Sequence, residues 1–231
     1  MFKLRSILIL ILMAVFFIPF IGCKKPPKPK TPESLISEEL RQDSVQQKPT
    51  RGKIPNKYGV KSGYIESEIK NNILNVPITG KIYFDKYGDL EMSEEISEME
   101  VMGQKIKTHT RKIVKDGFIS SIDMIKKTGN KIKINSIQDL NSFDFSKYSK
   151  EMLANWQISE LPDEIVLNKK CKVTSFESGK MKGTVWTWEG ITLKLILVTA
   201  GMEFESRATK LETNIAIKRD LFEIPQDVKI F

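Results

Sequence analysis

Two cysteines, one histidine and a run of glutamates are the residues of this 231-residue chain that could carry chemistry. A single histidine excludes a His-rich metal site, and one histidine among many serines and aspartates does not define a catalytic triad without geometry. His109 shares every second position with Lys105, Lys107 and Arg111, a pattern typical of one solvated strand face. We therefore favour an exposed strand position for His109 over a general base.

The acidic run could bind a cation through Glu94, Glu95, Glu98 and Glu100. Such a run more often forms an outward-facing surface. The chain also contains no glycine-rich loop of the kind that cradles phosphates. The sequence therefore predicts no catalytic residue, no metal site, no cofactor and no enzymatic activity.

Cys171 lies in the alternating stretch Lys170-Cys171-Lys172-Val173, where it shares a side with Val173. A free cysteine in such a position behaves as a small apolar residue. We interpret Cys171 as a buried strand residue rather than a nucleophile.

Cys23 directly follows Gly22, at the end of an apolar run over residues 6–21. This run is shorter than the roughly 20 residues that a transmembrane helix needs. Lys3 and Arg5 precede it, and a cationic start followed by a short apolar stretch is typical of a cleavable secretion signal. The sequence therefore predicts a signal peptide over residues 1–22.

The junction resembles the bacterial lipobox, in which a small residue precedes an obligatory cysteine, although Phe20 stands where leucine is usual. The resemblance implies cleavage between Gly22 and Cys23 and acylation of Cys23, with palmitate among the acyl groups. Two or three acyl chains on one residue make a practically permanent anchor. The alternatives are an uncleaved anchor helix and an ordinary signal peptide with a chance cysteine.

Composition limits the class of the remaining chain. The formal net charge is +8, and loss of Lys3 and Arg5 lowers it to about +6, which favours contact with anionic surfaces. The basic residues form no clustered basic helix, so we predict no nucleic-acid partner. With Cys23 acylated, Cys171 has no intramolecular disulfide partner, and the fold depends on its core alone.

Residues 23–57 are predicted to be a tether. The stretch 24–30 is rich in proline and lysine, a composition that favours an extended, semi-rigid spacer. The chain stays polar up to Lys57, and we expect little fixed structure there. One folded domain is expected from Tyr58 to Phe231.

From Tyr58 onward the pattern is one of apolar and polar residues alternating with period two, separated by turn residues. Asp116-Gly117 is a strong hairpin signal. The basic side of residues 105–111 is expected to pair with the acidic side of residues 94–100. The predicted strands cover residues 61–70, 78–85, 90–102, 105–115, 118–126, 131–134, 168–176, 183–189, 191–200 and 202–214.

Residues 146–156 give the best helical pattern of the domain. Tyr148, Met152 and Trp156 recur at intervals of four, which would place three large side chains on one helical stripe. Residues 220–225 are expected to be a short closing segment, whose Phe222 and Ile224 cover a sheet edge.

These elements indicate a mainly β fold of the α+β class. We expect a strongly curved antiparallel sheet, an open half-barrel of about nine to eleven strands, covered by one or more helices. Apolar space left in the hollow is the natural place for a ligand.

Several short motifs of the domain resemble a group of uncharacterised bacterial outer-membrane lipoproteins that are related to the LolA/LolB-type lipoprotein carriers. The resemblance covers roughly residues 58–230. The motifs are Tyr83 to Gly88, Met102 to Gln104, Lys127 to Gly129, Gly183 to Lys194, Ala208 to Asn214 and Phe222 to Pro225.

The resemblance implies a LolA-like half-barrel with an apolar cavity that can hold acyl chains. A chain anchored permanently at Cys23 is nearer to the acceptor type of such proteins than to a soluble shuttle. We find no clear counterpart of the exposed apolar loop of an acceptor. The implied location is the cell envelope, most simply the outer membrane facing the periplasm, with surface exposure left open.

The leading hypothesis is therefore a membrane-anchored lipoprotein that binds an acyl chain, of a lipid or a lipoprotein, or another apolar ligand. For Trp186 and Trp188 the alternative is core packing, and both can hold if cavity and core are continuous. A second hypothesis is a structural or interaction lipoprotein without a small ligand, which contacts a partner through Lys105, Lys107 or Arg111. The oligomeric state is left open. The candidate cavity-lining residues are Phe84, Trp156, Trp186, Trp188, Leu193 and Leu195.

Overall fold

The structure is a computed structural model, and it describes residues 55–72, 78–101, 104–140 and 142–231. Contacts divide the chain into residues 1–50 and 51–231, and every described residue belongs to the second unit. The predicted signal peptide, Gly22, Cys23 and nearly all of the predicted tether lie outside the described residues.

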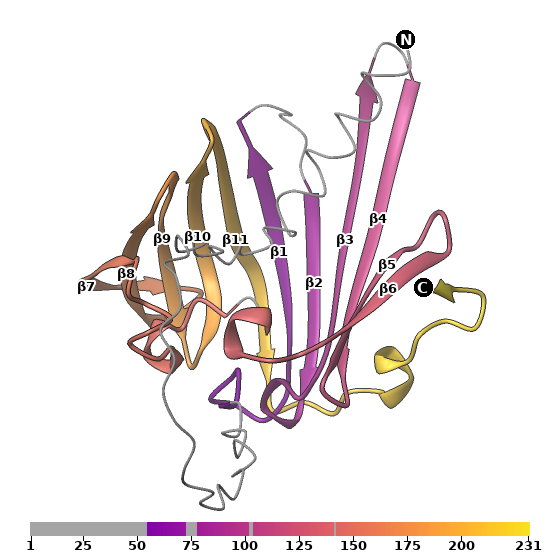
Figure 1. The fold of residues 1–231 in the computed structure, drawn as a ribbon, viewed down its shortest axis with the longest axis horizontal. Coiled ribbons are helices and arrows are strands. Elements are labelled where there is room, and N and C mark those ends of the chain that lie inside the picture. Colours follow the sequence, from indigo (N-terminus) through magenta and orange to yellow (C-terminus); the bar gives the residue numbers. More distant parts are fainter. Residues whose placement is uncertain (1–54, 73–77, 102–103, 141) are drawn as a thin grey trace, which may run out of the picture. The chain divides into compact units, whose positions relative to one another are not determined.

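The described residues form one twelve-stranded sheet, in the spatial order β12-β6-β5-β4-β3-β2-β1-β11-β10-β9-β8-β7 (Figure 1). Every pairing is antiparallel except that of β12 with β6. The strands are β1 (Gly63–Asn71), β2 (Ile78–Asp85), β3 (Leu90–Val101), β4 (Gln104–Lys115), β5 (Phe118–Asp123), β6 (Thr128–Lys133), β7 (Gln157–Val166), β8 (Lys169–Ser178), β9 (Met181–Trp188), β10 (Ile191–Thr199), β11 (Met202–Thr213) and β12 (Lys229–Ile230).

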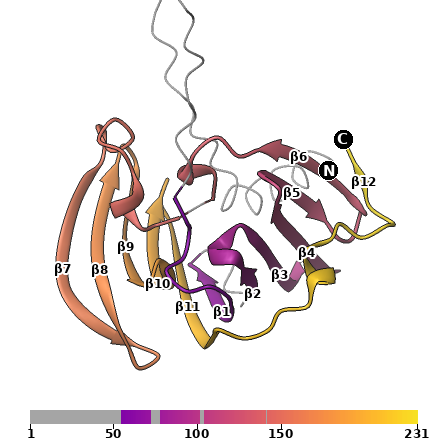
Figure 2. The same cartoon turned by 90° about the horizontal axis from the view of Figure 1, so that it is seen from below.

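Two runs of neighbouring strands, β1 to β6 and β7 to β11, make up this sheet together with β12, which pairs with β6. They are joined where β11 returns to pair with β1, from Gly63 opposite Thr213 to Asn71 opposite Phe204. The sheet curves, and its edge strands β7 and β12 stand at opposite ends without pairing (Figure 2). The prediction of a mainly β fold with an open, curved half-barrel is confirmed.

Tight turns follow from residues that tolerate positive φ. Asp116 and Gly117 have φ values of 51° and 76°, the backbone that a two-residue hairpin of type I′ requires. Glu189 and Gly190 repeat this arrangement between β9 and β10, with φ values of 49° and 73°. The turn before β6 is formed differently, because the Asp123 carboxylate accepts hydrogen bonds from the backbone N–H groups that follow it.

Alternating side chains of β1 to β5 point to two faces. We call the face with Phe84, Glu91 and Val114 the inner face, and the face with Tyr83 and Ile113 the outer face. The irregular segment 134–156 covers the inner face, where Ile134, Ile137 and Leu140 pack with Val114 and Ile119, and Tyr148 and Met152 lie against them.

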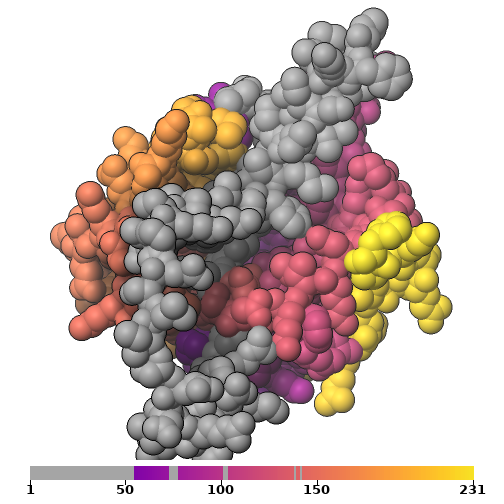
Figure 3. All heavy atoms as spheres, viewed as in Figure 1, coloured from indigo at the N-terminus to yellow at the C-terminus, as the bar shows by residue number. Residues whose placement is uncertain are grey.

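The C-terminal segment covers the outer face. It runs from β11 through the 3₁₀-helix η4 (Arg219–Phe222) to β12, and Phe222 packs with Met92, Ile113 and Ile122. In Figure 3 these C-terminal residues, in yellow, lie beside the rose-coloured strands at that edge of the sheet. Phe222 and Ile224 were expected to cover a sheet edge. They cover the outer face of β3, β4 and β5 instead, since Ile224 packs against the same cluster.

A third cluster connects the two halves of the sheet. It contains Ile65 and Phe84 from one half, and Cys171, Trp186 and Leu193 from the other. Cys171 is fully buried and free, which confirms its interpretation as a buried strand residue.

The helix expected over residues 146–156 does not form, and that prediction is wrong. A 3₁₀-helix, η3 (Phe145–Lys147), ends at Tyr148, whose backbone is extended, and turns follow it. The expected stripe is divided between two sites, since Tyr148 and Met152 pack near β4 and β5 while Trp156 packs on Phe145 and Phe176. Tertiary contacts therefore override the local pattern. The remaining described helices are also 3₁₀: η1 (Lys86–Gly88) and η2 (Ile137–Leu140).

Two further differences concern strands. β7 was missed because Pro162 lies inside it; the strand is at the edge and its register shifts between Leu161 and Glu164, the setting in which a sheet tolerates proline. β6 begins at Thr128, three residues before the strand expected over residues 131–134.

Replacing Leu193 by alanine tests the cluster that joins the two halves. Leu193 is 1% exposed, so Leu193→Ala is expected to lower the free energy of unfolding by about 2–5 kcal/mol. Leu161→Ala is the control, because Leu161 is 42% exposed on the edge strand. Urea unfolding followed by tryptophan fluorescence measures both, and equal losses for the two variants would contradict the assignment of this core.

Candidate functional site

A buried ion pair between Lys57 and Glu91 lies on the inner face. The Lys57 ammonium lies 2.7 Å from the Glu91 carboxylate, which also accepts a hydrogen bond of 2.7 Å from the Tyr58 hydroxyl. Burial favours a protonated Glu91, but the charges of Lys57 and Lys112 and the hydrogen bonds outweigh it and lower its pKa. Lys57, the last residue of the predicted tether, is therefore part of the packed structure.

Two further ionisable groups lie beside this pair. Glu95 shares the inner face of β3 with Glu91, and Lys112 projects from β4 opposite Ser93. Burial raises the pKa of Glu95 to about 7, against the opposing charge of Lys112. Burial and the charge of Lys57 lower the pKa of Lys112 to about 8. The inner face is thus polar and charged around Glu91, Glu95 and Lys112.

An apolar pocket lies farther along the inner side, where the segment 142–153 passes over β7, β8 and β9. We call it the aromatic pocket; its volume is about 220 Å³. Behind it the rings of Phe143 and Phe176 stack with centroids 5.7 Å apart, and Phe145 and Trp156 pack on the same Phe176. Its lining residues are Phe143, Asp144, Phe145, Ser146, Leu153, Ile158, Glu160, Lys172, Thr174 and Thr187.

The polar side chains of this pocket differ in their hydrogen bonds. Asp144 accepts hydrogen bonds from Ser146 and Lys147, and Lys172 forms an ion pair of 2.5 Å with Glu160 at the mouth. Thr174 is only 6% exposed, and among the described residues its hydroxyl has no hydrogen-bond partner. A hydroxyl that lines a pocket and bonds to no neighbouring group can form a hydrogen bond to a ligand atom there.

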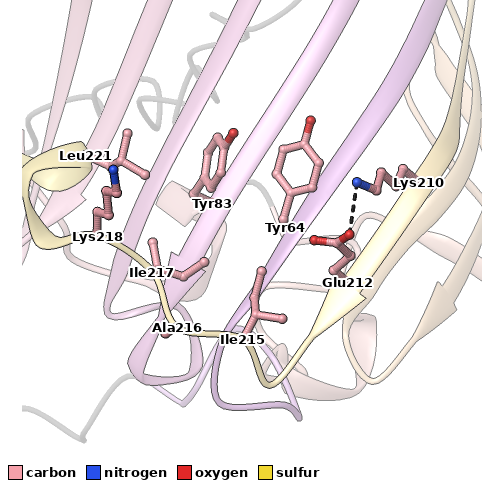
Figure 4. Close-up of a pocket in the computed structure, with 9 residues that line it drawn as sticks. All are labelled: Tyr64, Tyr83, Lys210, Glu212, Ile215, Ala216, Ile217, Lys218 and Leu221. Carbon is pink, nitrogen blue, oxygen red and sulfur yellow. Dashed lines mark ion pairs between the residues drawn. The ribbon is translucent and has the colours of Figure 1, made fainter.

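A second pocket lies on the outer face, between β1, β2 and β11 and the chain that follows β11 (Figure 4). We call it the outer groove; its volume is about 490 Å³. It lies on the side of the sheet opposite to Phe84 and Ile65, because Tyr83 and Tyr64 precede them in their strands. Its lining residues are Tyr64, Tyr83, Lys210, Glu212, Ile215, Ala216, Ile217, Lys218 and Leu221.

Four of the six residues proposed from the sequence as cavity lining come together in one packed cluster, and the other two lie elsewhere. Phe84, Trp186 and Leu193 are buried in one packed cluster, and Trp188 lies against it. Trp156 supports the aromatic pocket from behind, and Leu195 is half-buried on β10. None of the six lines the aromatic pocket or the outer groove.

The predicted basic strand face exists, with one change. Lys105 and Lys107 are exposed opposite Glu100 and Glu98, as expected. His109 and Arg111 are partly buried, and both bond to Glu94, at 2.6 and 2.8 Å. Burial favours a protonated Glu94, but the hydrogen bonds of Arg111 and His109 outweigh it and lower its pKa. His109 therefore belongs to a structural ion-pair cluster.

The described part of the chain contains neither a candidate metal site nor a candidate membrane-spanning helix. Within it, no three His, Cys, Asp or Glu side chains are placed to hold a metal ion. None of its helices has the length and apolar character needed to cross a bilayer.

Sequence reasoning missed the residues that line both pockets. It predicted no role for Phe143 or Phe145, and Thr174 and Tyr64 were expected to be ordinary strand positions. The available signal was the spacing of Phe143, Phe145 and Trp156, which places several aromatic side chains in one irregular segment.

Comparisons with known proteins concern the fold only. No family model matches the chain, and no curated protein matches it. The chain is similar to an uncharacterized conserved protein from Thermus thermophilus, with a TM-score of 0.47 and 7% identity over 74% of this chain and 90% of that one.

Two further solved structures are similar. One is a chain of the MucA/MucB complex of Pseudomonas aeruginosa (TM-score 0.46, 14% identity, 74% of this chain and 58% of that one). The other, from Vibrio parahaemolyticus, is a domain provisionally described as an outer membrane lipoprotein-sorting protein (TM-score 0.33, 13% identity, 70% and 89%). The neighbours thus include the class that the sequence resemblance indicated.

The raised pKa of Glu95 predicts a pH dependence of stability. Between about pH 4.5 and 7 the folded chain binds this proton more tightly than the unfolded chain, so the contribution of Glu95 to stability decreases as pH rises through that window. Glu95→Gln removes this loss and is expected to stabilise the protein at pH 8, relative to pH 4, by on the order of 1–2 kcal/mol.

Urea unfolding of both proteins at pH 4 and pH 8 measures the difference. Glu98→Gln is the matched control, because Glu98 is exposed on the same strand. An unchanged pH profile for Glu95→Gln would contradict the burial of this carboxyl.

Proposed function

We propose that this chain is a lipid-anchored binding protein of the bacterial cell envelope, which holds an acyl chain or another elongated apolar molecule in the aromatic pocket. The observation that carries the proposal is the hydroxyl of Thr174, which bonds to no described residue and lies in a pocket wall whose other members include Phe143, Phe145 and Leu153. A ligand with an oxygen atom beside an apolar body satisfies both features.

The size of the pocket limits the occupant. Its volume of about 220 Å³ is below the roughly 300–1,000 Å³ of pockets that enclose a drug-sized molecule. The aromatic pocket therefore suits the end of one chain rather than a whole lipid, and the rest of the ligand would extend past the mouth.

Charged side chains at the mouth suit an amphiphile. Lys172 and Glu160 are 52% and 71% exposed there, and an exposed ion pair contributes little to stability. Lys172 can therefore exchange Glu160 for an anionic head group at small cost.

The predicted anchor defines the setting. A chain acylated at Cys23, in the outer membrane facing the periplasm, stays at one membrane and receives or presents its ligand there. Two or three acyl chains on one residue make such an anchor practically permanent. This role belongs to lipid or lipoprotein handling without a catalytic step.

A second candidate function is that of an interaction protein without a small ligand. It is favoured by the exposed end of the outer face, where Lys105 is 77% exposed and its ion pair with Glu98 is long, at 3.9 Å. Such loosely paired charges are available to a partner. Crosslinking through Lys105 or Lys107 in cells would distinguish this function from ligand binding.

Filling the aromatic pocket tests the leading proposal. The probe is the fluorescent fatty acid cis-parinaric acid, titrated into the chain that begins at residue 23 and carries Ser in place of Cys23. Leu153→Trp is expected to weaken binding at least about tenfold, because the larger side chain occupies the pocket. Thr174→Val, which removes only the hydroxyl, is expected to weaken it about fivefold or more.

Leu161→Trp is the control, since it adds the same side chain at an exposed position of the edge strand. Absence of fatty-acid binding, or equal binding by all variants, would overturn the proposal. Native mass spectrometry of the protein isolated from bacterial cells gives an independent measurement of a bound lipid.

The predicted anchor has its own test. Cys23→Ser is expected to abolish incorporation of radiolabelled palmitate, because the acylated thiol is lost, whereas Cys171→Ser is expected to keep it, because that thiol is buried. Label retained in Cys23→Ser would show that the lipobox interpretation is wrong.

A further inference from the structure

The outer groove has a rigid aromatic floor. Tyr64 and Tyr83 face each other across the β1–β2 pairing, with ring centroids 4.7 Å apart. The Tyr64 hydroxyl donates a hydrogen bond of 2.9 Å to Glu66, and the Lys210 ammonium stands 5.5 Å from the Tyr64 ring centroid. These contacts fix the two rings before any ligand arrives.

The opposite wall is the irregular segment that follows β11, in which Lys218 has an extended backbone with φ −68° and ψ 130°. The segment after β11 crosses the ends of β1 and β2 below the tyrosines (Figure 4). Its start is fixed to Ser62, whose carbonyl accepts from the Asn214 N–H and whose hydroxyl donates to the Ile215 carbonyl. Farther on, Ile217 and Leu221 pack against the cluster of Met92 and Phe222.

The backbone groups of Ala216 and Ile217 are available for hydrogen bonding. Among the described residues, none hydrogen-bonds to the N–H or C=O groups of Ala216 and Ile217. Unpaired backbone groups held beside an apolar floor can form hydrogen bonds to the main chain of an extended peptide, as the exposed edge of a sheet does in strand addition.

Charges of the groove indicate the sign of the partner. Its acids are already bonded, since Glu212 pairs with Lys210 at 2.9 Å and Glu66 accepts from Tyr64. Lys218 is exposed at the rim and forms no ion pair with a described residue. The charged side chain that remains available to a partner at the rim is therefore the Lys218 ammonium.

We propose that the outer groove binds a short, extended and acidic peptide segment of a partner protein. An apolar side chain of this peptide packs on Tyr64 and Tyr83, its backbone pairs with Ala216 and Ile217, and a carboxylate meets Lys218. This site is on the opposite side of the sheet from the aromatic pocket and does not depend on its occupant.

Three fluorescein-labelled heptapeptides test the proposal by fluorescence anisotropy, with the chain from residue 23 carrying Ser in place of Cys23. One alternates valine and glutamate, one alternates valine and lysine, and the third is the glutamate peptide with alternate backbone nitrogens methylated. The glutamate peptide is expected to bind at least about tenfold more tightly than the other two, because each lacks either the carboxylates or the main-chain donors.

Charge reversal at the rim completes the test. Lys218→Glu is expected to weaken binding of the glutamate peptide about tenfold and to strengthen binding of the lysine peptide. Lys180→Glu is the matched control, because it makes the same charge change at an exposed hairpin between β8 and β9.

Three outcomes would overturn the proposal. They are failure of all peptides to bind, equal binding of the methylated peptide, and equal effects of Lys218→Glu and Lys180→Glu. The last would show that net charge alone attracts the peptide. Because fatty-acid binding is measured at the other pocket, its failure leaves this test unaffected.

Discussion

Everything described in this sheet depends on the pairing of β1 with β11. It joins the run β1 to β6 with the run β7 to β11, and one buried cluster takes its apolar side chains from both runs. The cluster that contains Ile65 and Phe84 also contains Trp186 and Leu193, so the hydrophobic contacts cross this seam together with the hydrogen bonds. A parallel or slipped pairing would turn the buried residues of one half toward solvent.

The seam also separates the two candidate sites. The aromatic pocket belongs to the inner side of β7 to β9, under the segment that leaves β6. The outer groove belongs to β1, β2 and β11, beside the segment that leaves β11. In each case an irregular segment covers a strand surface incompletely, and the remaining space forms the pocket. A curved sheet with one covering segment on each face thus offers two independent surfaces from a single core.

Local alternation allowed much of the fold to be predicted from the sequence. The strands around Tyr83, His109 and Leu193, the hairpin at Asp116-Gly117 and the pairing of acidic with basic faces all follow from contacts between residues near in sequence. The helix expected at Tyr148, Met152 and Trp156 did not form, because its side chains pack on strands far away in the chain. The pockets were missed for the same reason: Thr174 and Phe143 meet only after the sheet has curved. Phe84, Trp186 and Leu193 were identified as apolar and inward, and the sequence contained no signal that they pack against one another.

The position of Lys57 has a mechanical consequence. Its ammonium is bound to Glu91, and the next two residues form backbone hydrogen bonds to two different hairpins, Tyr58 to Tyr87 and Gly59 to Glu189. A force transmitted along the chain from an anchor at Cys23 would therefore act first on this buried ion pair and these two hydrogen bonds. Tension would be shared between both halves of the sheet instead of peeling a single edge strand. A half-barrel anchored in this way would thus keep its fold while such a force acts on it.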